Sequence, residues 1–177
     1  MKKINIEGQN NRYLIKKVNK EEKKTLNKNR IENTNLLDNH NYQKQLLNII
    51  YLDDCNDNHD NIKEIEFIKK NISNKINSYI QQDEKKNRVN NETPLLREEI
   101  YELLIENQMQ CYYCNCKVFI YYEKYRDDYQ WTLERKDNNL PHFKNNCVIS
   151  CLKCNLQRRT KNMDNFKFTK NLVIKKK

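Results

Sequence analysis

Hydrophobic side chains repeat at helical spacing in the first half of the chain. A cluster of apolar residues within Tyr42–Leu52 predicts a short helix. A longer series follows, and its members keep to the three- and four-residue spacing of one helical face: Ile62, Ile65, Ile68, Ile72, Ile76, Tyr79 and Ile80. This series predicts an amphipathic helix, which we expect to fade in the polar stretch 81–92.

The pattern changes in the second half. Thr93 and Pro94 are good residues for the start of a third helix, whose buried stripe is Leu96, Ile100, Leu103 and Leu104. Further on, Trp131 and Leu133 alternate as in a strand, with Trp131 expected in the core, and "NNCVIS" predicts a second strand. The segment "CLKCNLQRRTKN" then leads into a helix. The order of elements predicts an α+β protein, with a helical N-terminal region and a small C-terminal unit.

Composition and charge narrow the class of partner. The chain has 177 residues with 34 Lys and Arg against 24 Asp and Glu, which gives a net charge of +10. The excess lies at the two ends, in residues 1–30 and 156–177, as expected for a protein that binds a polyanion. No run of apolar residues is long enough for a membrane span and no signal peptide is recognisable, so we expect an intracellular protein without a membrane partner.

Four of the seven cysteines form two C-x-x-C pairs, Cys111 with Cys114 and Cys151 with Cys154. Each pair can direct two thiolates at one ion, and two pairs complete the tetrahedral shell of a structural Zn²⁺. Cys116 offers a competing C-x-C arrangement, but the symmetric spacing favours Cys114. The pairs are far enough apart for a hairpin and a loop. We therefore expect a zinc-stapled unit.

The order of knuckle, strand, loop, strand, knuckle and helix in residues 109–165 resembles the HNH endonucleases, also called ββα-metal or His-Me finger nucleases. The stretches "WTLERKDNNL" and "SCLKCNLQRR" are closest in pattern to HNH proteins of large DNA viruses, and "KINSYIQQD" upstream also looks like that group. The resemblance implies an α+β fold with a zinc-stapled ββα-metal domain. The predicted organisation is a basic arm (1–30), a helical region and linker (31–92), an HNH domain (93–170) and a basic tail (171–177).

The resemblance also implies roles for particular residues. Glu134 falls on the acidic metal-ligand position at the end of the first strand, and Asn155 falls on the last ligand position in the helix. Together they would hold a catalytic Mg²⁺ or Mn²⁺. Asn146 falls on the asparagine that braces the loop. The chain departs from the family at Arg135, which occupies the usual position of the general base and cannot give up its proton at neutral pH.

His142 is the candidate replacement for the missing base, since it is the one histidine between the cysteine pairs. Two alternatives stay open: His142 is only a loop residue, or the metal alone activates water. Arg135, Arg158 and Arg159 are expected to hold the oxygens of the nucleic-acid phosphate. The spacing of Asn155, Arg158 and Arg159 predicts that they share one helical face.

The leading hypothesis is a metal-dependent HNH endonuclease that hydrolyses phosphodiester bonds of double-stranded DNA. The alternative is a catalytically inactive, zinc-stabilised nucleic-acid-binding module, in which Arg135 marks a dead site. A third hypothesis is a zinc-organised protein-interaction domain, which the basic ends disfavour. The target site, the choice of DNA over RNA and the oligomeric state do not follow from the sequence.

Overall fold

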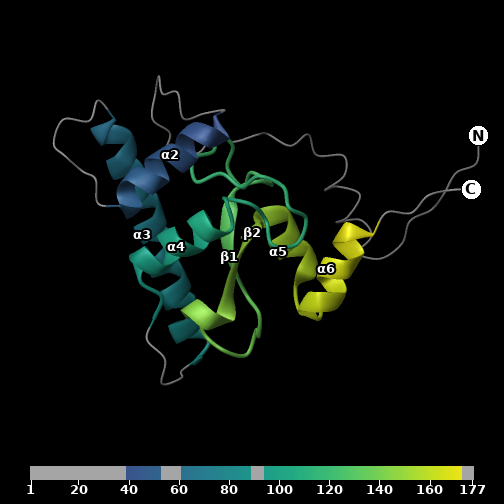
Figure 1. The fold of residues 1–177 in the computed structure, drawn as a ribbon. Coiled ribbons are helices and arrows are strands. Elements are labelled where there is room, and N and C mark those ends of the chain that lie inside the picture. The colour runs from purple at the N-terminus through teal and green to yellow at the C-terminus, as the bar shows by residue number, and fades with distance from the viewer. Residues whose placement is uncertain (1–38, 53–60, 89–93, 173–177) are drawn as a thin grey trace, which may run out of the picture.

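The protein is a mixed α+β structure, with helices packed around one two-stranded antiparallel sheet (Figure 1). The computed structural model describes residues 39–52, 61–88 and 94–172. The predicted basic arm, Thr93 and the last five residues of the tail lie outside the described residues. The elements in chain order are α2 (His40–Tyr51), α3 (Ile62–Lys85), α4 (Arg97–Glu106), β1 (Trp131–Arg135), η1 (Lys144–Asn146), β2 (Cys147–Cys151), α5 (Leu152–Arg158) and α6 (Met163–Asn171).

The described helices before the sheet follow most of the predicted apolar spacing, but Ile62 and Leu96 are exposed, and Leu96 precedes α4 and is not part of its buried stripe. In α3, Ile65, Ile68, Ile72 and Ile76 are all buried. The helix ends inside the polar stretch 81–92, where it was expected to fade. It continues to Lys85, because it has a polar contact face as well as an apolar one, as described below. The helix α4 begins at Arg97, later than Pro94 suggested, and Glu99 caps its start by accepting a hydrogen bond from the Leu96 amide at 2.9 Å.

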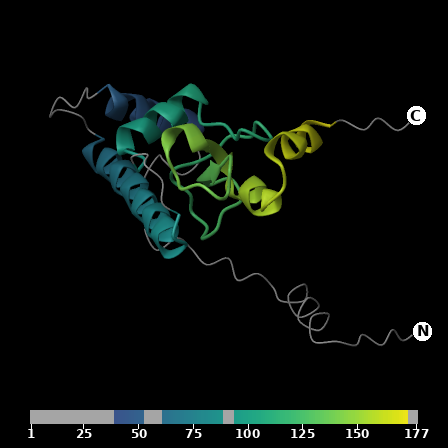
Figure 2. The same cartoon turned by 90° about the horizontal axis from the view of Figure 1, so that it is seen from below.

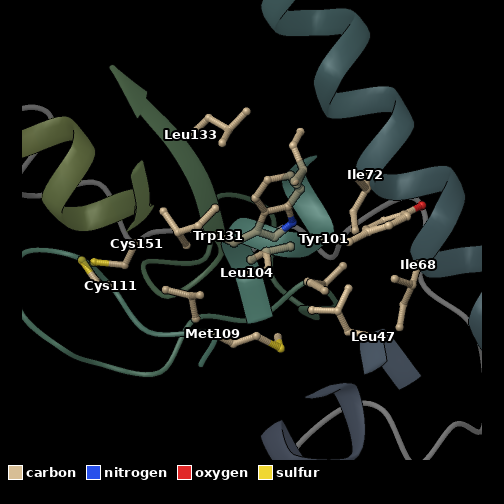
Figure 3. Packing of buried hydrophobic residues seen from close by; sticks show 14 of the residues in the cluster. Leu47, Ile68, Ile72, Tyr101, Leu104, Met109, Cys111, Trp131, Leu133 and Cys151 are labelled. Atoms are coloured by element: carbon tan, nitrogen blue, oxygen red, sulfur yellow. The ribbon is translucent and has the colours of Figure 1, made fainter. Parts of the chain in front are cut away.

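A single cluster of buried side chains joins the helical region to the sheet. Trp131 of β1 lies in its middle with no exposed surface, and Leu104, Ile72 and Met109 lie around it (Figure 3). Full burial of side chains this large is the main stabilising contribution to folding. Because one core serves both parts, the position of α3 relative to β1 is fixed by packing.

The sheet and the helix after it carry most of the residues that the sequence pattern singled out. Strands β1 and β2 pair in register, with Trp131 opposite Cys151 and Arg135 opposite Cys147. The loop between the strands returns to the sheet through η1, and α5 begins directly after Cys151. The end of β1, the loop and α5 therefore lie close together.

Polar side chains of α3 cover the outer edge of β1. The ammonium group of Lys75 donates to the carbonyl oxygen of Trp131 and lies 4.5 Å from the centre of its indole ring. One helical turn later, the hydroxyl of Tyr79 accepts a hydrogen bond of 3.1 Å from the amide of Leu133. An edge strand carries unpaired backbone groups, and these contacts satisfy two of them.

The helix α5 ends at Arg158, and α6 lies beyond it, at the side of the sheet away from α3 (Figures 1 and 2). Arg159 leaves the helix with φ of 53°, in the left-handed region, so Arg158 and Arg159 do not share a helical face as predicted. Phe166 of α6 packs edge-on against the ring of Tyr113, with ring centres 5.0 Å apart. Within the described residues, no helix has the length and apolar character needed to cross a membrane.

Candidate active site and cysteine cluster

An open pocket of about 430 Å³ lies where the end of β1, the following loop, α5 and the last turns of α3 meet. Five of the residues singled out in the sequence line it: Glu134, Arg135, His142, Asn155 and Arg159. The other lining residues include Tyr79, Lys86 and Arg88 from the region of α3. The pocket therefore combines a carboxyl group, an imidazole, an amide and several cations.

His142 is held in this pocket by Asp83, a residue of α3 that the sequence analysis did not single out. The side-chain Oδ2 of Asp83 lies 2.7 Å from the ring Nδ1 of His142 and accepts a second hydrogen bond, also 2.7 Å, from the His142 backbone amide. The ring of Tyr79 lies 4.6 Å from the imidazole, centre to centre. Burial lowers the pKa of His142 below its ordinary value, while the hydrogen bond and charge of Asp83 oppose this shift. The lowered pKa of His142 favours the neutral form of its imidazole.

Glu134 is almost fully buried and forms an ion pair with Arg158 of α5. Arg158 also donates to the backbone carbonyls of Arg135 and Lys136, at 2.9 and 2.8 Å. With only 2% of its surface exposed, Arg158 has a structural role here and does not present its guanidinium to a nucleic acid, which corrects the expectation from the sequence. Burial raises the pKa of Glu134 to about 7, although Arg158 opposes the shift. The second carboxylate oxygen, Oε2, is buried and has no hydrogen-bond partner among the described residues.

The two asparagines from the sequence pattern have different surroundings. Asn146 is buried and spans the loop: its Oδ1 accepts from the Asp137 amide at 2.9 Å, and its Nδ2 donates to the carbonyls of Asp137 and Pro141. It braces the loop that carries His142. Asn155 lines the pocket and donates through Nδ2 to Thr132 Oγ1 at 3.2 Å. Its Oδ1 is therefore left to accept a ligand.

The cations around the pocket come from three parts of the chain. Arg135 donates through Nη1 to Asp83 Oδ1 at 3.2 Å, and Arg88 lies 3.7 Å from the same oxygen. Lys86 and Arg159 complete the set and are exposed. Of the three arginines expected at a phosphate, the structure brings Arg135 and Arg159 to the pocket and adds two cations from the end of α3.

At the start of α5, whose N-cap is Cys151, four cysteine sulfurs lie within 4.8 Å of one another: those of Cys111, Cys114, Cys116 and Cys151. The Sγ of Cys114 is 3.3 Å from that of Cys116 and 3.9 Å from that of Cys151. A tetrahedral zinc thiolate site, with Zn–S bonds of about 2.3 Å, separates its sulfurs by about 3.8 Å. The cluster could therefore hold a metal ion such as zinc, and Figure 3 shows the sulfurs of Cys111 and Cys151 side by side.

The cluster differs from the predicted ligand set at one position, because Cys116 takes the place expected for Cys154. Asn115 adopts a left-handed conformation with φ of 54°, which turns the chain back on itself. The Cys111 amide then donates to the Cys116 carbonyl at 2.8 Å, and the Cys116 thiol reaches the other sulfurs. The Cys154 thiol lies beside the cluster, against Cys114 and Cys151. Hydrogen bonds from the thiols of Cys116 and then Cys151 hold the pKa of Cys111 well below its ordinary value.

His40 and the stretch 81–88 make contacts that the sequence did not predict. His40 of α2 is buried, and its Nε2 lies 3.1 Å from the Met109 carbonyl oxygen. The stretch 81–88, expected to be a plain linker, supplies Asp83, Lys86 and Arg88 to the pocket. The signal for Asp83 was present in the sequence, since it lies four residues after Tyr79 and eight after Lys75 on one helical face.

Comparison with known proteins gives one informative similarity. No protein-family profile matches the chain, and no solved structure matches it either. An uncharacterized protein of Acanthamoeba polyphaga mimivirus is 32% identical over 71 residues. The match covers 40% of this chain and 12% of the viral protein, so the chain spans only a small part of that relative's length. This similarity points to a viral relative and assigns no activity.

Proposed function

We propose that the protein is a metal-dependent endonuclease of the HNH type that hydrolyses phosphodiester bonds in DNA. The observation that carries the proposal is the convergence of Glu134, His142 and Asn155 on one open pocket. The resemblance to HNH nucleases implies metal binding by Glu134 and Asn155, and His142 is the candidate base. A zinc-binding or interaction domain has no need for all three at one site.

His142 serves as the general base in this proposal. Its Nδ1 lies 2.7 Å from Oδ2 of the Asp83 carboxylate, and with the ring proton on Nδ1 the lone pair of Nε2 is free to accept a proton. A neutral imidazole in that position accepts a proton from a water molecule that attacks phosphorus. This arrangement supplies the base that Arg135, at the usual position, cannot supply.

The donor set at the pocket fits a hard cation. The buried Oε2 of Glu134 has no partner among the described residues, and the Nδ2 bonds of Asn155 leave its Oδ1 available. Carboxylate and amide oxygens are the ligands that Mg²⁺ and Mn²⁺ prefer. Such an ion, when bound, would supply Lewis-acid stabilisation of the oxygen that leaves phosphorus.

The phosphate-binding role falls to the cations at the pocket. Arg135 and Arg159 present guanidinium groups that can pair with two phosphate oxygens at once, and Lys86 and Arg88 extend the positive surface along the end of α3. This surface fits the backbone of a nucleic acid, whose charge dominates its affinity for proteins.

One observation favours the alternative of an inactive nucleic-acid-binding module. The ion pair with Arg158 occupies one oxygen of Glu134 and compensates the charge that a catalytic cation would compensate. In this reading Glu134 serves only the fold, and the pocket binds a phosphate without cleaving it.

Cleavage of supercoiled plasmid by the full-length protein separates the two functions. We expect nicking or linearisation with Mg²⁺ or Mn²⁺ and none after dialysis against EDTA, with recovery when Mg²⁺ and Zn²⁺ are returned together. Glu134→Gln and Asn155→Ala should abolish cleavage and retain DNA binding, whereas Asn165→Ala on exposed α6 should have no effect. Tight DNA binding without cleavage by the parent protein in either metal would support the inactive module.

A further inference from the structure

The helix α3 contacts the outer edge of β1 at three positions, four residues apart. Lys75 and Tyr79 bind the backbone of Trp131 and Leu133, as described above. Asp83 is the next residue on this helical face, and it reaches the end of the strand. Four residues of helix rise about 6.0 Å, and two residues of strand rise about 6.6 Å. The four-residue step along the helix and the two-residue step along the strand are nearly equal in length, so three successive contacts can form.

The third contact differs from the first two in what it binds. Asp83 binds side chains and the loop: Arg135 at Oδ1, and His142 at Oδ2 through both its ring Nδ1 and its backbone amide. The carboxylate is nearly buried, with 6% of the residue exposed. A buried carboxylate that contacts one nitrogen of a histidine ring can fix which ring nitrogen carries the proton.

We infer that Asp83 is a positioning residue for His142, which holds the ring proton on Nδ1 and thereby keeps Nε2 free to act on substrate. The inference rests on the proposed function, because it gives His142 its chemical form in the proposed reaction. It also makes α3, which lies upstream of the zinc-stapled stretch 109–165, a part of the active site.

A purely structural role for Asp83 makes a different prediction. The hydrogen bond to the His142 backbone amide and the pairing with Arg135 would hold the loop whatever the state of the ring. Only the Nδ1 contact couples Asp83 to the tautomer and to the titration of His142. The groups that face the imidazole are Asp83, Arg135, Arg88 and the ring of Tyr79.

The direct test is ¹⁵N NMR of the histidine rings in the full-length, zinc-loaded protein. The chain has three histidines, so a His142→Gln sample assigns the signal. In the parent protein we expect the neutral ring of His142 to carry its proton on Nδ1. Asp83→Asn removes the charge that raises the pKa of His142 and leaves burial, Arg135 and Arg88 to lower it, so the titration midpoint should move to lower pH. A proton on Nε2 in the parent protein would overturn the inference without any variant.

Cleavage kinetics add a second measurement. Asp83→Asn should lower the plateau of kcat against pH by about 10²-fold, within the usual range for general-base catalysis, with little change in KM. Glu84→Gln is the matched control, since it removes the same charge from an exposed neighbour on α3 and should leave kcat unchanged.

The two proposals can fail separately. A parent protein that cleaves DNA, together with an Asp83→Asn variant of unchanged kcat and unchanged His142 signals, would overturn the positioning role and leave the nuclease standing. A parent protein that cleaves nothing, but whose His142 ring shows the Nδ1 proton and the dependence on Asp83, would support the positioning role and contradict the nuclease.

Discussion

Replacement of Arg158 should destabilise the protein far more than replacement of Arg159, its neighbour in sequence. In Arg158→Met the carbonyls of Arg135 and Lys136 lose their donors, and Glu134 loses its partner. A hydrogen bond from a charged donor to a part-buried carbonyl contributes about 1 kcal/mol, so loss of the two should cost about 2 kcal/mol. The exposed Arg159 uses only backbone groups in its contacts, so Arg159→Met should change stability by less than about 0.5 kcal/mol.

The contribution of Glu134 to this loss depends on pH. Burial raises the pKa of Glu134 to about 7 in the folded protein, against an ordinary value of 4.5, with Arg158 opposing the rise. A carboxyl group with a raised folded pKa weakens stability as pH rises above its unfolded pKa. Loss of Arg158 raises that pKa further, and the extra cost appears only above about pH 7. We therefore expect a loss of about 2 kcal/mol at pH 6, and about 3–5 kcal/mol at pH 9, the range for a broken buried ion pair.

Chemical denaturation followed by tryptophan fluorescence measures these differences, because the chain has a single tryptophan, Trp131, and it is fully buried. The double variant Glu134→Leu with Arg158→Met should recover most of the extra loss at pH 9, since it leaves no unpaired charge. If Arg158→Met is as stable as Arg159→Met at both pH values, the structural role of Arg158 is wrong. Arg158 would then be available for phosphate contact, as the sequence suggested.

Two further predictions concern the metal and the nucleic acid. We expect elemental analysis to find one zinc per chain, and Cys116→Ser to weaken zinc retention more than Cys154→Ser; the reverse order would restore the two C-x-x-C pairs as the ligand set. Lys86→Gln and Arg88→Gln should each flatten the log–log salt dependence of DNA binding by about 0.9, as for one phosphate contact. Lys63→Gln, at the far exposed end of α3, is the control, and a slope that changes equally in all three variants would argue against a phosphate site at the pocket.

Local spacing of residues along the chain was enough to predict much of the secondary structure. The apolar positions of α3 repeat with the period of a helix, so the buried isoleucines could be identified before any packing was known. The alternation around Trp131 predicted β1 in the same way. The convergence of Glu134, His142 and Asn155 also followed from local order, because a strand, a short loop, a second strand and a helix return the chain to one place.

Tertiary structure decided the contacts that depend on how distant segments dock. Asp83 reaches His142 because the polar face of α3 is aligned with the edge of β1, over a separation of 59 residues along the chain. The spacing of Lys75, Tyr79 and Asp83 places the three residues on one helical face, but it does not indicate which strand that face contacts.

Two residues with left-handed backbone conformation, Arg159 and Asn115, account for the other differences between the predicted and the observed site. Arg158 and Arg159 are identical in type and adjacent, yet the left-handed turn at Arg159 leaves one buried against Glu134 and the other exposed at the pocket. A similar turn at Asn115 brings Cys116 into the cysteine cluster. A left-handed residue other than glycine is held in place by the contacts around it, and those contacts exist only once the chain has folded.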